Sequence, residues 1–87
     1  MSFDVRLKKS AEKELKNIKS SILSIIDEVL LNLVDDPHPK NSLKIQGEDN
    51  LFRIRCAQYR IIYEIDKKSK VIEILAIVNR KDAYKKK

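Results

Sequence analysis

Three arginines in the second half of the chain have the types and spacing that could hold an anion. Residues 51–65 read as two alternating runs of apolar and polar side chains with a short break near the middle. Side chains on a strand point to opposite faces in turn, so Arg53 and Arg55 share one face, and Arg60 joins them from the next strand. Three guanidiniums on the open face of one hairpin repel each other unless something anionic lies across them. The pattern therefore predicts a positively charged site that binds an anion there.

Arginine is well suited to contact with phosphate. Its planar guanidinium presents paired N–H donors to two oxygens and keeps its charge at any ordinary pH, which also makes it a poor general base. The structural alternative is an ion pair between Arg53 and Glu64 across the hairpin, an ordinary exposed contact. The open face offers only Glu64 and Glu73 against the three strand arginines, so we favour phosphate binding by the cluster.

A second group of candidate side chains follows the last predicted strand, in the strongly basic tail of residues 80–87. Tyr84 is the only nearby aromatic hydroxyl outside the predicted core. It could donate a proton to a leaving oxygen, or exchange one if nearby cations lower its pKa. It could instead stack on a base of single-stranded RNA. The alternative is a disordered, lysine-rich tail without a catalytic role.

The remaining reactive residue types are scarce. One cysteine excludes an internal disulfide, and one cysteine with one histidine cannot build a zinc site from protein ligands alone. Cys56 has the inward parity of its strand, which favours a buried, inert thiol. His38 lies between two prolines, which indicates a rigid loop rather than a catalytic cleft. We expect any chemistry here to need no metal and no cofactor.

Size and charge narrow the class of protein. The chain has 87 residues, 43% of them hydrophobic, which predicts one small domain over residues 1–87 with a modest core. It has no apolar stretch of about 20 residues and no signal-peptide pattern, so we expect a soluble, cytoplasmic protein. Residues 37–87 carry thirteen Lys and Arg against six Asp and Glu. That excess favours a polyanionic partner, nucleic acid or an acidic peptide, over a role in solubility alone.

The residues ahead of the arginines predict one strand and two helices. Residues 3–7 alternate as a short strand, and Ser10 could cap the helix that follows. A corner at 19–21, where a serine could cap again, leads into a longer helix. Its apolar stripe is formed by Ile22, Ile25, Ile26, Val29, Leu30 and Leu33. Pro37 ends this helix, because the residue before a proline is pushed out of helical geometry.

The second half predicts a loop and three strands. Residues 37–50 are polar and form a long loop with a brief extended piece at 43–45. Strands are expected at about 51–57, 59–66 and 71–78, and the last is apolar on both faces towards its end, as in a central or covered strand. The predicted fold is α+β, with an N-terminal strand and a helical hairpin packed on one face of a small, mainly antiparallel four-stranded sheet.

This order resembles a known family of proteins. Three segments carry the resemblance: Leu-Phe-Arg-Ile-Arg from residue 51, Tyr-Arg-Ile-Ile-Tyr-Glu-Ile from residue 59, and Asn-Arg-Lys-Asp-Ala-Tyr from residue 79. Together they resemble the RelE/ParE superfamily of toxins from prokaryotic type II toxin–antitoxin pairs. The resemblance is closest to the RelE side, whose members cut messenger RNA in the ribosomal decoding site. It implies a RelE-like fold and a metal-independent endoribonuclease, an mRNA interferase, in which the RNA's own 2′-hydroxyl attacks the neighbouring phosphate.

The resemblance also implies roles for single residues. The catalytic candidates, which would hold the scissile phosphate and assist proton transfer, are Arg60, Arg80 and Tyr84. The resemblance places Arg53 and Arg55 on the RNA backbone. To these RNA-binding candidates we add Lys44, Lys81 and Lys85, which the resemblance does not itself supply. This chain departs from many relatives in having Arg53 and Arg55 where lysines are common, and Asn79 where histidine is common.

Partners follow from the same resemblance. A cognate antitoxin with an acidic, amphipathic segment would wrap the domain and neutralise it. The ribosome and messenger RNA would be the targets of the toxin. No membrane or metal partner is expected. Two other functions remain open. One is a ParE-like poison of DNA gyrase, which would not need Arg80 and Tyr84, and the other is a catalytically inactive module that only binds the antitoxin.

Overall fold

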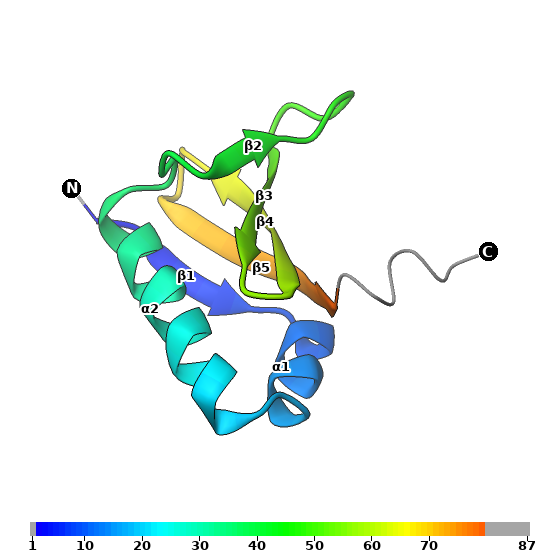
Figure 1. Cartoon of the computed structure of the whole chain (residues 1–87). Helices are drawn as coiled ribbons and strands as arrows, with labels where there is room; N and C mark the ends of the chain where they lie inside the picture. The colour runs from blue at the N-terminus through cyan, green and yellow to red at the C-terminus, as the bar shows by residue number, and fades with distance from the viewer. Residues whose placement is uncertain (1, 80–87) are drawn as a thin grey trace.

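The computed structural model describes residues 2–79, which form a five-stranded sheet and two helices (Figure 1). The helices are α1 (Lys9–Lys16) and α2 (Ser20–Asp35). The strands are β1 (Asp4–Leu7), β2 (Ser42–Lys44), β3 (Leu51–Cys56), β4 (Tyr59–Asp66) and β5 (Val71–Asn79). In this part of the chain, neither helix has the length and apolar character needed to cross a bilayer. The predicted α+β class, with a mainly antiparallel sheet, is confirmed.

The strands lie in the order β1-β5-β4-β3-β2. β1 runs parallel to β5, and the other neighbours are antiparallel. β5 therefore has a strand on each side and is an interior strand, one of the two positions that its apolar end predicted. The predicted four strands were one too few, because β2 pairs with β3 at the edge of the sheet. β2 has three residues and one apolar side chain, Leu43, too short a segment to show an alternating pattern.

The predicted serine caps are wrong. Lys8 and Lys19 are the N-cap residues of the two helices, and neither makes a side-chain capping bond. The hydroxyl of Ser10 instead donates to the carbonyl oxygen of Leu75 at 3.1 Å. Leu75 is the residue that the register between β4 and β5 skips, so this bond joins α1 to an irregular point of the central strand. The end of α2 at Asp35, just ahead of Pro37, is as predicted.

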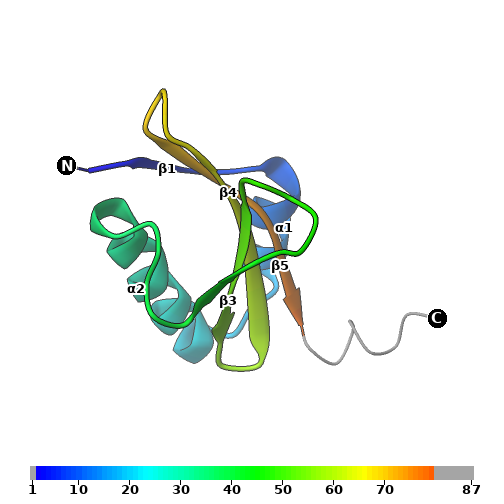
Figure 2. The ribbon, with the colours of Figure 1, turned by 90° about the horizontal axis from the view of Figure 1, so that it is seen from above.

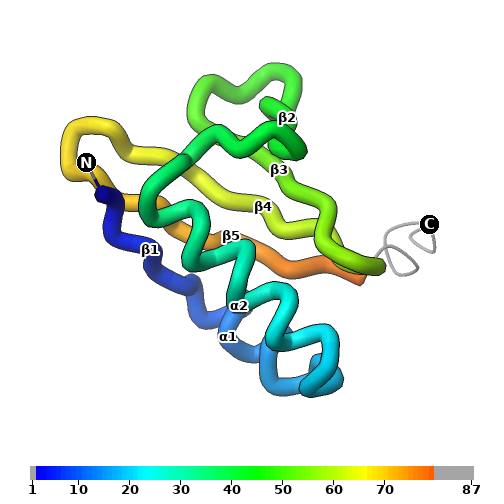
Figure 3. Tube along the Cα trace, turned by 60° about the vertical axis from the view of Figure 1, so that its left-hand side comes forward, coloured from blue at the N-terminus to red at the C-terminus, as the bar shows by residue number. Residues whose placement is uncertain are grey.

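The hydrophobic core lies between the helices and one face of the sheet (Figure 3). Ile26 and Leu33 of α2 are fully buried there. From the strands, the core receives Ile54, Cys56, Ile61, Tyr63, Ile65, Ile72, Ile74 and Ile77. Alternation along each strand then directs the intervening side chains to the opposite face, which no helix covers. We call this uncovered side the open face.

Tyr63 links the core to the segment that precedes β2. Its side chain is fully buried, its ring stacks on Phe52 with centroids 5.8 Å apart, and its hydroxyl donates to the carbonyl oxygen of Pro37 at 2.9 Å. Burial raises the pKa of the Tyr63 hydroxyl. This contact ties the residues after α2 to the sheet, along the path of the chain that Figure 2 shows running from α2 to β3.

Candidate nucleic-acid interface

The three strand arginines gather at one end of the open face. Arg55 lies directly opposite Arg60 across the β3–β4 ladder, and Arg53 lies opposite Ile62. Side chains of directly opposed residues are neighbours on the same face of a sheet. The strand register therefore confirms the prediction that Arg53, Arg55 and Arg60 share one face of the sheet. Between these positions, Ile54 and Ile61 point the other way into the core.

A hollow of about 330 Å³ lies over this cluster, and five side chains line it. They are Asn41, Leu43, Arg53, Arg55 and Arg60. Leu43 lies opposite Arg53 in the β2–β3 ladder, so the edge strand provides one wall. Arg60 is half-buried, whereas Arg53 and Arg55 are exposed. The guanidinium-bearing side chains thus share one concave surface.

No carboxylate of residues 2–79 neutralises these arginines. The one ion pair in this range joins Arg6 to Asp4 at 3.5 Å, on β1, and no carboxylate oxygen of the range lies within 4.0 Å of the three guanidiniums. The alternative Arg53–Glu64 pair does not form, because Glu64 lies opposite Leu51. Two like charges placed directly opposite each other destabilise a sheet. A bound anion would remove that repulsion, so the arrangement favours a phosphate-binding role.

Charge on the open face is sorted along β4. Arg60 near its start lies opposite Val78, and Ile62 follows opposite Ala76. Further along, Glu64 lies opposite Glu73. The face is therefore basic at the β3–β4 turn, whereas towards the β4–β5 turn the carboxylates of Glu64 and Glu73 lie among cations, with Arg6 opposite Glu73 and Lys67 nearby. A polyanion would be attracted more strongly to the first end, where no carboxylate of residues 2–79 offsets the arginines.

The other predicted site residues fall elsewhere. Lys44 lies opposite Phe52 in the ladder and so belongs to the opposite side of the sheet from the arginines. The candidates outside the described residues are Arg80, Lys81, Tyr84 and Lys85. β5 ends at Asn79, which lies opposite Tyr59, the residue just before Arg60. Sequence reasoning missed Asn41 and Leu43, whose only signal was a short extended piece in a polar loop.

Cys56 and His38 lie apart from this hollow. Cys56 is buried, as predicted, and burial raises the pKa of its thiol, the reverse of what an activated nucleophile needs. His38 is exposed, and its ring meets the Phe52 ring edge-on with centroids 4.8 Å apart.

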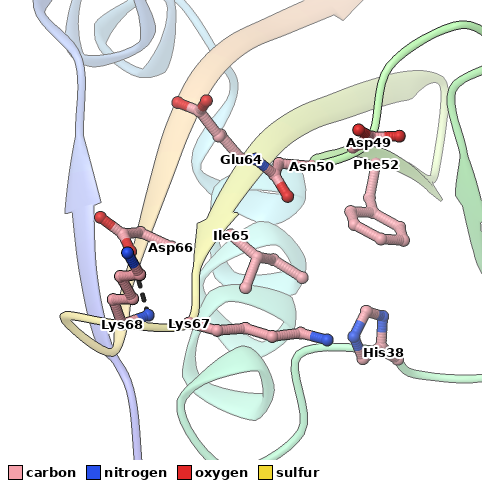
Figure 4. A pocket seen from close by; sticks show the side chains of 9 residues that line it. All are labelled: His38, Asp49, Asn50, Phe52, Glu64, Ile65, Asp66, Lys67 and Lys68. Atoms are coloured by element: carbon pink, nitrogen blue, oxygen red, sulfur yellow. Dashed lines mark hydrogen bonds between the residues drawn. The ribbon is translucent and has the colours of Figure 1, made fainter.

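A second hollow, of about 500 Å³, lies beside His38 (Figure 4). Carboxylates and lysines are mixed along its wall, among them Asp49, Glu64 and Lys67. Asp66 there accepts a backbone hydrogen bond from Lys68 at 3.1 Å, and hydrogen bonds from Ser69 lower the pKa of its carboxyl. Within residues 2–79, no three His, Cys, Asp or Glu side chains are grouped closely enough to hold a metal ion. This mixed surface suits a polyanion less well than the arginine hollow.

Comparison with known proteins places the chain in a family. The model of the ParE toxin family of type II toxin–antitoxin systems, parDE, matches residues 5–84. The putative toxin RelE1 of Methanocaldococcus jannaschii is 31% identical over 88 residues, covering 98% of each chain.

Solved structures agree with this assignment. A chain of the archaeal RelE–RelB complex from Pyrococcus horikoshii OT3 superposes with a TM-score of 0.84 at 29% identity, covering 92% of this chain and 97% of that one. The isolated E. coli RelE toxin shares the fold with a TM-score of 0.80 at 16% identity, covering 90% and 84%. The chain therefore belongs to the RelE/ParE superfamily of toxins of type II toxin–antitoxin systems.

Proposed function

We propose that this chain is a metal-independent, ribosome-dependent endoribonuclease that cleaves messenger RNA, and that a cognate antitoxin neutralises it in the cytoplasm. One observation carries the proposal. Arg53, Arg55 and Arg60 share a hollow in which no carboxylate of residues 2–79 offsets their charge. The 31% identity to a putative RelE toxin supports the choice of RNA as the anion.

Cleavage would use the 2′-hydroxyl of the RNA as the nucleophile. Attack on the adjacent phosphorus forms the new P–O2′ bond and breaks the P–O5′ bond, leaving a 2′,3′-cyclic phosphate and a 5′-hydroxyl. The protein must align the attack, stabilise the extra negative charge of the transition state and manage two proton transfers. Half-buried Arg60 would clamp the phosphate, while the exposed Arg53 and Arg55 would position the backbone.

The hollow itself has no side chain suited to proton transfer. Its five lining residues are three arginines, an asparagine and a leucine, and none of these side chains exchanges protons near neutral pH. We assign proton transfer to Tyr84 and assistance at the phosphate to Arg80, which follow Asn79 in the chain. We also infer that the ribosome pre-aligns the message. On this account the chain cuts RNA in the decoding site well and free RNA poorly.

A partner protein follows from the relatives. The Pyrococcus horikoshii chain and the Mycobacterium tuberculosis RelBE2 chain come from toxin–antitoxin complexes. By analogy, we propose that residues 1–87 act as one toxin domain held inactive by its own antitoxin.

A second function keeps support, because the matching family model is that of ParE toxins. A gyrase poison would share the fold and arrest growth without cutting messages. Arg80→Ala and Tyr84→Phe distinguish the two, since arrest by a gyrase poison would survive both changes.

The direct test expresses the chain alone and maps the 5′ ends of cellular messages. We expect new ends inside codons of translated regions, and their loss in Arg60→Ala. The matched control is Arg6→Ala, which removes an exposed arginine from β1 and should leave the cuts unchanged. Intact messages with damaged DNA would support the gyrase poison instead. Absence of toxicity would support a module that only binds the antitoxin.

A further inference from the structure

One wall of the arginine hollow is apolar and exposed. Residues 2–79 contain three exposed large hydrophobic side chains, Ile25, Leu31 and Leu43. The first two lie on α2, whereas Leu43 is 58% exposed and lines the hollow beside Arg53. A phosphate gains nothing from an apolar surface. A ligand that uses both parts carries an anionic group and an apolar group side by side, as a nucleotide does.

Asn41 adds a polar group to the same wall. Its side-chain amide makes no hydrogen bond within residues 2–79, although it lines the hollow. An amide offers an acceptor oxygen and two donor hydrogens, the combination that pairs with the edge of a nucleobase.

The segment that carries Asn41 and Leu43 is held in place. Ser42 bonds the carbonyl oxygen of Pro39 twice, from its hydroxyl at 2.8 Å and from its backbone N–H at 2.9 Å. Tyr63 holds Pro37, and β2 pairs with β3. Side chains that are free for a ligand on a backbone that is already fixed lose little entropy on binding, which favours recognition.

We propose that Leu43 and Asn41 form a nucleobase subsite beside the phosphate clamp, and that this subsite sets which base is accepted next to the cut. Leu43 packs against the face of the base and Asn41 pairs with its edge. The inference rests on the proposed endoribonuclease function and deepens it, because it identifies what the site reads in the RNA. Specificity then arises from β2 and the residue just before it, in a segment that the alternating pattern did not reveal as a strand.

The test adds purified chain to a reconstituted cell-free translation system and maps the 5′ ends of one defined message. For Leu43→Ala we expect about tenfold slower cleavage, because the shortened side chain loses most of its apolar contact with the base. For Asn41→Ala we expect the base preference at one position beside the cut to flatten. Leu31→Ala is the matched control, an exposed leucine on α2 outside the hollow, and should behave as the wild type.

Two further measurements separate the outcomes. Thermal unfolding of each variant shows whether it is folded, and Leu43→Met should restore the rate because it replaces the apolar surface. If the wild type cuts the message, and Asn41→Ala and Leu43→Ala cut it at the same rate and with the same base preference, the subsite is overturned and the endoribonuclease function stands. No cuts by the wild type would overturn both.

Discussion

At the scale of single residues, the informative contact is an unfavourable one. Arg55 and Arg60 occupy directly opposed positions, and the nearest carboxylate on the open face of β4, Glu64, lies further along the strand opposite Leu51. Sheets ordinarily place opposite charges at such positions because the pair then stabilises the ladder. A repulsive pair inside a hollow is what a site for a polyanion requires, and the interaction becomes favourable when the anion is present.

Arg60→Ala should therefore separate activity from stability. We expect cleavage in the translation system to fall about 100-fold or more, the usual effect of removing one donor to a developing anion. The free energy of unfolding should stay level or rise slightly, since the repulsion from Arg55 is gone. Arg60→Lys keeps the charge without the paired donors, so its cleavage rate should lie between those of the wild type and Arg60→Ala. A large loss of stability in Arg60→Ala would show that Arg60 is structural.

Tyr63 gives a pH dependence of stability. Burial raises the pKa of its hydroxyl above the ordinary value of about 10, so the folded chain holds the proton more tightly than the unfolded chain does. This contribution is complete below about pH 10 and is lost as the pH rises through the higher folded pKa. Tyr63→Phe should show a shallower alkaline fall in the free energy of unfolding, measured by denaturant titration. At neutral pH it should be about 1 kcal/mol less stable, because the Pro37 carbonyl loses its donor. Parallel curves across the alkaline range would contradict this.

At the scale of elements, alternation and helical spacing predicted most of the fold. β3, β4 and β5 each have enough residues for a period of two to be visible, and the stripe from Ile22 to Leu33 identified α2. β2 was missed as a full strand because three residues carry no period. The serine caps were wrong because propensity alone does not show that Ser10 has a partner on another element, the Leu75 carbonyl. The arginine face could be predicted for the same reason as the strands, whereas Asn41 and Leu43 depend on a loop conformation.

The two helix starts offer a matched pair of substitutions. Ser10→Ala should lower the free energy of unfolding by about 0.5–1 kcal/mol, because the Leu75 carbonyl loses a hydrogen bond. Ser20→Ala should be nearly neutral, because Lys19 is the N-cap of α2 and no side chain caps that helix. Denaturant titration measures both. The reverse order, with Ser20→Ala the more damaging, would mean that serine capping governs these helices after all.

At the scale of the whole molecule, the two ends of the open face differ in charge. Its basic end lies at the β3–β4 turn, and the opposed carboxylates of Glu64 and Glu73 lie towards the β4–β5 turn among lysines. Net charge alone, +6 for the chain, would attract a polyanion without choosing where it binds. The uncompensated arginines favour binding of the RNA at the end of the open face that β2 borders. The candidate subsite lies at the same end, because Leu43 is opposite Arg53 in the β2–β3 ladder.

The central claim is that the open-face arginines hold the backbone of RNA, and the salt dependence of binding to a short single-stranded RNA tests it most directly. Each neutralised phosphate contributes a slope of about −0.7 in a plot of log affinity against log salt. Replacing Arg53, Arg55 and Arg60 by alanine should make the wild-type slope shallower by about 2. Replacing Lys9, Lys13 and Lys16 by alanine removes the same charge from α1 and should change the slope little. Equal slopes for the wild type and the triple arginine variant would contradict the account.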